Sequence, residues 1–160
     1  MKSKITTILS FASTAFKQFA RVKDPQKKLV KEASIAIEIS RMIREHVIPS
    51  KILVAVFAKY PDLTYQEFVD AAGAGFPLNP NLFSRAQKAY EFITKYQKQL
   101  PMICDTSVSY ISALRAVERV YAKNKAEKRF VSDFKKLNKV GKVSGPTAVR
   151  KWRVMMMGEL

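Results

Sequence analysis

The chain has 160 residues, a length typical of one compact domain or of two small ones that share a core. Hydrophobic residues make up 48% of it, which supports a folded core and excludes wholesale disorder. Lys and Arg number 29 against 13 Asp and Glu, so the formal net charge is +16. Such an excess repels itself in a compact fold and therefore favours an anionic partner. Nucleic acid is the first expectation, an anionic membrane surface the second, and a basic protein without such a partner the third.

The chain contains one cysteine, Cys104, and one histidine, His46. A single cysteine excludes an internal disulfide and fits a reducing, cytoplasmic compartment. The usual zinc sites need four nitrogen or sulfur ligands, so we expect no metal site of that kind. We expect His46 at an exposed helix end and Cys104 buried among apolar neighbours.

The first residues combine a basic start with a moderately apolar stretch, as a secretory signal does, but Ser and Thr interrupt it and Lys17 follows directly. Its larger apolar residues recur at helical spacing: Ile5, Ile8, Leu9, Ala12, Phe16 and Phe19. We therefore predict an amphipathic helix that packs on a core or a partner, with binding to a membrane surface as the alternative. No stretch approaches the roughly 20 apolar residues that span a bilayer.

Capping residues divide the rest of the chain into helices. Asp24-Pro25 is typical of an N-cap followed by the first helical residue, and predicts a long, largely buried helix that ends near residue 48. Ser50 is the expected cap of a short helix over residues 51–59. The pattern Thr64 to Glu67 is a capping box that opens a third helix, which ends at the glycines of residues 73–75.

The same signals continue toward the C-terminus. Asn79-Pro80 predicts a helix that reaches about Lys98, and one of residues 105–107 is expected to cap another that runs through Tyr121. A basic helix is expected over residues 126–137, and a last short helix should carry Val149, Trp152 and Met155 or Met156 inward. No segment alternates with the period of a strand. We therefore expect an all-α multi-helix bundle, with a helical core over residues 1–100 and a basic helical region over residues 101–160 packed on it.

The segment 63–98 has the order of elements found in a helix-turn-helix: a short capped helix, a turn and a second capped helix. Its residues 65–69 and 75–83 resemble helix-turn-helix segments of small regulators, including those carried by plasmids and phages. The resemblance covers about thirty residues and departs from the common form, because Gly73 and Gly75 precede a longer connection that contains Pro77. It implies a DNA-binding regulator.

The second of these helices has two expected faces. Leu82, Ala86, Ala89 or Tyr90, and Ile93 recur at three- and four-residue spacing and are expected to face the core. The opposite face and the cap carry side-chain types that hydrogen-bond base edges or hold phosphates. The predicted DNA-binding residues here are Asn79, Asn81, Ser84, Arg85 and Lys88. The alternative is an ordinary capped helix pair whose polar residues face water.

Positive charge is densest over residues 115–153, which hold 13 Lys and Arg against three acidic residues. Phosphate contacts from such a region supply affinity without sequence choice. The residues concerned are Lys123, Lys125, Lys128, Arg129, Lys135, Lys136, Lys139 and Lys142 around one helix, with Arg150, Lys151 and Arg153 on the last. We expect Trp152 to anchor the core; stacking of Trp152 and Tyr121 on unpaired bases is the alternative.

The sequence shows no set of groups for catalysis. Gly73–Gly75 is too short for a phosphate-binding loop, and acidic residues are too few and scattered for the usual hard-cation sites. We therefore expect no enzyme activity and no cofactor. The leading hypothesis is a sequence-specific, cytoplasmic and nucleoid-associated regulator that binds duplex DNA. A homodimer is one expected form, because the sites of small regulators are often two-fold symmetric. The alternatives are an RNA- or single-strand-binding accessory protein and a protein-interaction or inhibitor protein.

Overall fold

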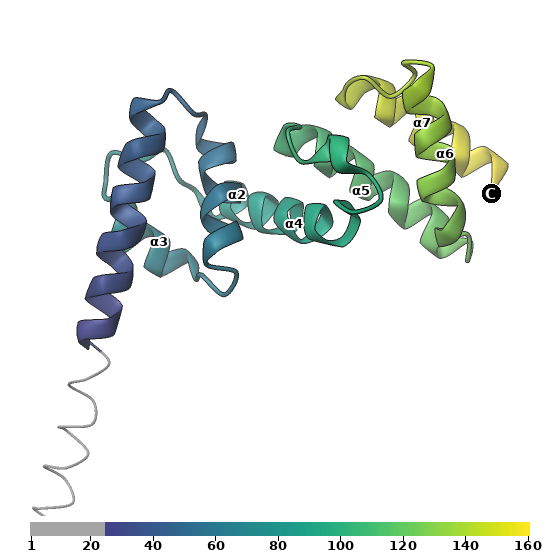
Figure 1. Cartoon of the computed structure of the whole chain (residues 1–160). Helices are drawn as coiled ribbons and strands as arrows, with labels where there is room; N and C mark the ends of the chain where they lie inside the picture. Colours follow the sequence, from purple (N-terminus) through teal and green to yellow (C-terminus); the bar gives the residue numbers. More distant parts are fainter. Residues whose placement is uncertain (1–24) are drawn as a thin grey trace, which may run out of the picture.

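The computed structural model describes residues 25–160, and within that range every regular element is a helix, which confirms the all-α prediction (Figure 1). A first helix covers residues 25–44. It is followed by α2 (Pro49–Lys59), α3 (Tyr65–Ala72), α4 (Pro80–Tyr96), the short 3-10 helix η1 (Pro101–Ile103), α5 (Val108–Lys123), α6 (Glu127–Lys139) and α7 (Pro146–Glu159). None of the helices in residues 25–160 has both the length and the apolar character needed to cross a membrane. The predicted N-terminal helix and the predicted cap at Asp24 lie outside the described residues.

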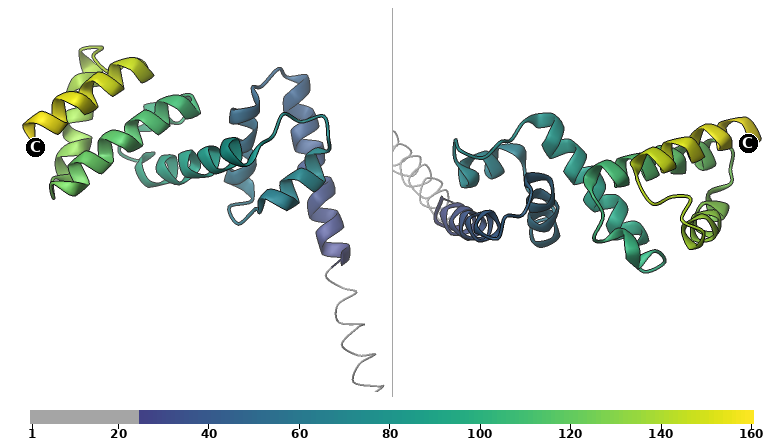
Figure 2. Two further views of the ribbon diagram at one scale, coloured as in Figure 1. Left: turned by 180° about the vertical axis from the view of Figure 1, so that it is seen from behind. Right: turned by 90° about the horizontal axis from the view of Figure 1, so that it is seen from above.

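Helix α4 connects two hydrophobic clusters, and the views from three sides show it extending from one group of helices to the other (Figures 1 and 2). Phe83 and Ala86 in its first half belong to a cluster with helix 25–44, α2 and α3. Phe92 and Tyr96 in its second half belong to a cluster with α5, α6 and α7. The same helix therefore sets the position of the basic C-terminal helices relative to the predicted helix-turn-helix segment.

Three of the predicted caps are present. Thr64 Oγ1 accepts the Glu67 N–H at 3.2 Å while Glu67 Oε2 accepts the Thr64 N–H at 2.9 Å, which is the complete capping box. Asn79 Oδ1 accepts the Leu82 N–H at 2.8 Å, and Ser107 is the cap of α5. The prediction for Ser50 was wrong. Helix α2 begins at Pro49 without a side-chain cap, since proline has no N–H that would need a partner there.

Helix 25–44 is less buried than predicted. Only Ile35, Ile39 and Met42 are buried in it, whereas Val30 and Ile37 are 67% and 69% exposed. The helix lies at the edge of the molecule, and only one of its faces contacts α2 and α3 (Figure 1). An apolar composition alone did not distinguish a helix packed on all sides from one packed on a single side.

The core-facing residues of α4 also differ in part from the prediction. Ala86 and Ala89 are buried as expected, but Leu82, Tyr90 and Ile93 are only partly buried. The buried set is Phe83, Ala86, Ala89, Phe92 and Tyr96. The aromatic side chains reach into the two separate clusters, and this determines which side of the helix faces inward.

Candidate nucleic-acid interface

An aromatic cluster joins α3 to α4 in the segment that resembles a helix-turn-helix. The ring of Phe68 in α3 lies 5.2 Å from that of Phe76 and 6.3 Å from that of Phe83, measured between centroids. Tyr65 contacts Phe83 edge-on at 5.5 Å. The connection between the helices covers residues 73–79 and begins at Gly73, whose φ of +71° favours glycine. It is longer than the 3–4-residue turn of the common motif.

The predicted DNA-binding residues of α4 lie on one face. Asn81, Arg85 and Lys88 are exposed and follow at intervals of three and four residues, while Ser84 is half-buried beside them. Arg85 Nη2 lies 3.5 Å from Ser109 Oγ, so the first turn of α5 is next to the middle of this face. The side chain of Asn79 caps its own helix, and that oxygen is therefore already used.

The second half of α4 is engaged with α5. Lys95 and the hydroxyl of Tyr96 both contact Glu118 Oε1. The hydrogen bond to Glu118 raises the pKa of Lys95. Asn81, Arg85 and Lys88 lie in the first half of α4, the part of a reading helix that contacts base edges in helix-turn-helix complexes. Glu91, Thr94 and Lys95 of the second half are exposed as well.

Helix α6 presents a basic stripe to the solvent. Phe130 and Phe134 are fully buried on its inner side. The predicted phosphate-binding residues Lys128, Lys135, Lys136 and Lys139 are all exposed, and three of them recur at spacings of seven and four residues. Arg129 is exposed as well and lies 3.6 Å from Asp133. Lys123, Lys125 and Lys142 are exposed at the ends of neighbouring helices.

Helix α7 buries Val149, Trp152 and Met156 and exposes its three cations, Arg150, Lys151 and Arg153. The Trp152 side chain is 4% exposed, and Tyr121 is fully buried. Both rings belong to the core, as expected for Trp152. The alternative in which these two rings stack on unpaired bases is wrong for this structure, because neither ring has an exposed face.

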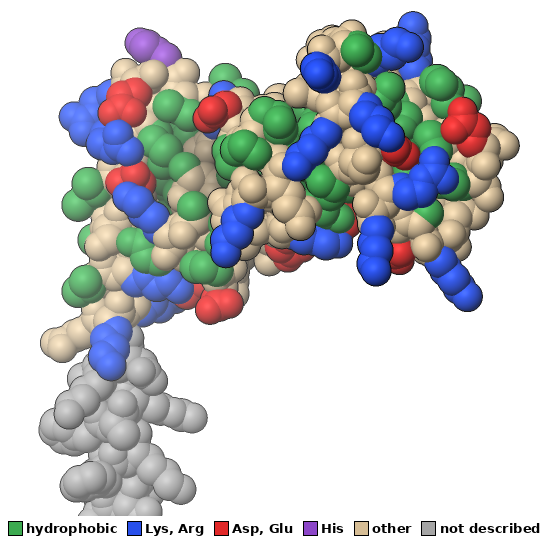
Figure 3. Space-filling view, turned by 45° about the vertical axis from the view of Figure 1, so that its right-hand side comes forward, with side chains coloured by type: hydrophobic (Ala, Val, Ile, Leu, Met, Phe, Trp, Pro, Cys, Tyr) green, Lys and Arg blue, Asp and Glu red, His purple; other side chains and the backbone are tan. Residues whose placement is uncertain are grey.

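Two of the five acidic side chains over residues 101–160 are engaged with other side chains, whereas most of the basic ones in that range have no ion-pair partner there. Glu118 contacts Lys95, and Asp133 accepts the Tyr121 hydroxyl at 2.9 Å. Burial and the bond to Asp133 raise the pKa of Tyr121 well above its usual value. Within residues 25–160, no ion pair involves Lys128, Lys135, Lys136, Lys139, Arg150, Lys151 or Arg153. Figure 3 shows Lys and Arg side chains projecting from several sides of this region.

One basic pocket was not predicted. Arg119 and Lys123 of α5 and Arg153 of α7 line a cavity of about 450 Å³ with apolar Val120 and Met157. No Asp or Glu side chain is among its lining residues. The sequence signal was the four-residue spacing of Arg119 and Lys123, which places both on one side of α5. Only the packing of α7 against α5 brings Arg153 to them.

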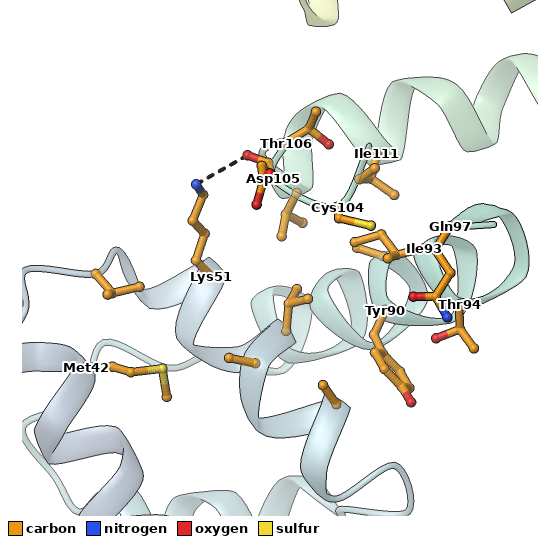
Figure 4. A pocket seen from close by; sticks show the side chains of 16 residues that line it. Met42, Lys51, Tyr90, Ile93, Thr94, Gln97, Cys104, Asp105, Thr106 and Ile111 are labelled. Atoms are coloured by element: carbon orange, nitrogen blue, oxygen red, sulfur yellow. Dashed lines mark hydrogen bonds between the residues drawn. The ribbon is translucent and has the colours of Figure 1, made fainter. Parts of the chain in front are cut away.

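A second cavity, of about 390 Å³, lies where α2, α4 and the segment after η1 meet (Figure 4). Its walls are mainly apolar, and Lys51 Nζ donates to the Asp105 carbonyl at 3.3 Å at one side. Cys104 lines it and is exposed, contrary to the prediction of a buried thiol, because its side chain points into the cavity. The lining includes one carboxylate, Asp105, and no histidine. The cavity therefore offers apolar surface and not a nucleophile with its base.

No group of three or more His, Cys, Asp or Glu side chains that could hold a metal ion occurs in the part of the chain that the structure describes. His46 is exposed directly after helix 25–44 and has a φ of 58°. In comparisons with known proteins, no family model, no curated protein and no solved structure matches the chain. The functional interpretation therefore depends on the geometry and charge of the chain alone.

Proposed function

We propose that the protein binds duplex DNA and acts as a sequence-specific regulator of the kind found on plasmids and phages. The observation that carries the proposal is the set of exposed cations on α6 and α7. Seven cations there have no acidic partner within the described residues. Each cation that neutralises a phosphate releases a counterion, which makes binding favourable and salt-dependent. We place the protein in the cytoplasm, associated with the nucleoid.

Sequence-specific binding requires side chains that reach base edges, and the first half of α4 carries side chains suited to that role. Asn81 has the donor and acceptor that pair with adenine, and Arg85 has the planar fork that pairs with guanine. Ser84 and Lys88 lie on the same side and offer a hydroxyl and a phosphate contact. A homodimer with two such helices is expected to bind a site with two-fold symmetry.

A second candidate function is protein recognition, and the exposed apolar residues of helix 25–44 favour it. Leu29, Val30 and Ile37 are all more than 60% exposed on that helix. Val30 and Ile37 lie seven residues apart and therefore on one side of the helix, and exposed apolar patches rimmed by polar residues mark interaction sites. An adaptor or inhibitor would use this face for a partner protein and would not need the cations of α6.

The two functions are separated by fluorescence anisotropy with labelled duplex DNA, single-stranded DNA and RNA at low and moderate salt. Duplex binding that exceeds single-strand binding and survives added salt on selected sequences supports the DNA-binding regulator. Binding to all three that disappears with salt supports a charge-driven binder without sequence choice. Absence of binding at both salt concentrations contradicts the proposal and leaves the protein-recognition function.

A further inference from the structure

Helices α5, α6 and α7 form a three-helix unit around the Trp152 side chain. The indole lies 5.8 Å from the Phe130 ring, 6.3 Å from the Phe134 ring and 5.9 Å from the Tyr121 ring, measured between centroids. The Tyr110 hydroxyl of α5 donates to the Val143 carbonyl at 2.6 Å. This bond holds the connection between α6 and α7 against α5. The order is therefore one supporting helix, a second helix, a fixed connection and a last helix, as in helix-turn-helix domains, although the connection over residues 140–145 is longer than the 3–4-residue turn of the common motif.

The outer face of α7 is exposed along its length. Thr147, Lys151 and Val154 follow at intervals of four and three residues and lie on one side of the helix. Arg150 lies beside them, and all four are exposed. This set combines a hydroxyl, two cations and apolar groups. It matches what base edges offer in the major groove, where guanine presents two acceptors and thymine a methyl group.

Cations lie on both flanks of this face. On the α5 side, Arg119, Lys123 and Arg153 line the pocket of about 450 Å³. On the α6 side, Arg129 and Lys136 line a second pocket of about 240 Å³ with α7, and the acidic residues Asp133 and Glu159 line the same pocket. A helix inserted into a major groove meets a phosphate backbone on each side. A central reading face with cations on both flanks has the charge distribution that such a groove requires.

We infer that α7 is a base-reading helix and that its face of Thr147, Arg150, Lys151 and Val154 enters the major groove of duplex DNA. This inference rests on the proposed function and names a reading surface for it outside the α4 segment. Arg150 pairs with a guanine, and the methyl groups of Thr147 and Val154 contact thymine. The flanking cations of α5 and α6 bind the two phosphate backbones.

The surroundings of α7 suit this role better than those of α4 in one respect. Glu91 follows Lys88 on the exposed side of α4 and would repel a phosphate. Helix α7 has no acidic residue before Glu159 in its last turn. The reading face of α7 therefore meets DNA without a nearby carboxylate on its own helix.

The test begins with selection of a preferred duplex from a random pool by the full chain. Anisotropy titrations then compare that duplex with a scrambled duplex of the same composition, for the native protein and for Arg150→Lys and Arg129→Lys. Lysine keeps the charge but lacks the two-pronged donor of arginine, so Arg150→Lys removes base reading and preserves phosphate attraction. The matched change at Arg129 on α6 tests a position expected to contact phosphate only. Circular dichroism melting checks that each variant folds.

The expected result is that Arg150→Lys weakens binding to the preferred duplex by about five- to a hundredfold, the range for one two-pronged base contact. Binding of Arg150→Lys to the scrambled duplex should stay within about twofold of the native value. Arg129→Lys should change the affinities for both duplexes by the same small factor and so leave their ratio unchanged. An unchanged ratio for Arg150→Lys overturns the inference, although the proposed DNA binding stands.

Two further outcomes contradict the inference in distinguishable ways. If the native protein binds neither duplex, the proposed function fails together with the reading helix. If Val154→Asp converts a dimer to a monomer in sedimentation and leaves the ratio of the two affinities unchanged, α7 is a self-association surface. Duplex binding without any preferred sequence overturns base reading by α7 but leaves charge-driven DNA binding in place.

Discussion

The indole of Trp152 stacks on the ring of Phe130, with the two centroids 5.8 Å apart and the planes 8° from parallel. This contact joins α7 to α6 and sets the angle at which their basic faces are presented. Because Trp152 also contacts Tyr121 edge-on, one side chain connects all three C-terminal helices. Trp152 is therefore a central contact in the arrangement of the three C-terminal helices, together with the Tyr121–Phe130 contact and the Tyr110–Val143 hydrogen bond.

Replacing Trp152 tests whether it is a core anchor. Trp152→Ala should lower the free energy of unfolding by about 3–5 kcal/mol, since it removes a large buried ring and leaves a cavity. Trp152→Phe should cost clearly less, because a ring remains against Phe130. Urea unfolding followed by circular dichroism measures both. A Trp152→Ala variant as stable as the native protein would contradict the role of Trp152 as a core anchor.

Arg85 and Lys136 are expected to contribute to DNA binding in different ways. Arg85→Ala should weaken binding to the preferred duplex by about 1–3 kcal/mol, if α4 contacts base edges as proposed. The variant should also bind with lower sequence specificity than the native protein. Lys136→Ala should weaken binding to all duplexes alike. It should also reduce the slope of the logarithm of the binding constant against the logarithm of the salt concentration by about one unit.

Titrations of both variants on preferred and random duplexes at several salt concentrations separate these effects. Lys135→Ala on the same stripe serves as the matched control for Lys136 and should behave in the same way. Equal losses on both duplexes for Arg85→Ala and Lys136→Ala would contradict the assignment of α4 as a reading helix.

The capping box at Thr64 predicts a pH dependence. The Thr64 N–H and the ammonium of Lys31 both donate to the Glu67 carboxylate and lower its pKa. The folded state therefore favours ionised Glu67. This contribution to stability is present above the ordinary pKa of glutamate and is lost as the pH falls through the lower folded-state value.

Glu67→Gln should therefore reduce stability at pH 7 and have a much smaller effect near pH 3. Urea midpoints at the two pH values measure the difference. Thr64→Ala removes the acceptor for the Glu67 N–H and should cost about 1 kcal/mol at pH 7. An effect of Glu67→Gln that is equal at both pH values would contradict the role of its charge.

Tyr96 predicts a loss of stability at alkaline pH. Burial and the hydrogen bond to Glu118 raise the pKa of Tyr96 from 10.0 to about 12. Between these values an unfolded chain loses the phenol proton while the folded chain retains it. The contribution of Tyr96 is therefore present below pH 10 and is lost as the pH rises toward 12.

Tyr96→Phe should show a shallower fall in stability between pH 10 and pH 12 than the native protein. Thermal melting across that range measures the slope, and ultraviolet titration should show one late-titrating phenol fewer in the variant than in the native protein, because Tyr110 and Tyr121 also have raised pKa values. Tyr65→Phe is the matched control, since Tyr65 is in the other hydrophobic cluster. The same slope in native protein and Tyr96→Phe would contradict the assignment.

Local signals predicted the helices more accurately than they predicted the helix faces. Thr64, Asn79 and Ser107 mark helix starts because their side chains satisfy free N–H groups of the first turn, an interaction within three residues. The inward face of α4 was predicted only in part. Phe83 and Phe92 enter different hydrophobic clusters, and helical spacing does not indicate how two clusters divide one helix.

Charge and periodicity in the chain were sufficient to predict an all-helical fold and the exposed cations of α6. Both features are determined by residues that lie close together in the sequence. The convergence of Arg119, Lys123 and Arg153 was decided by the packing of α7 on α5, which joins residues thirty or more positions apart. The burial of Tyr121 and the exposure of Val30 and Ile37 were decided in the same way. Each depends on which helices meet, and contacts between distant segments are formed only in the folded chain.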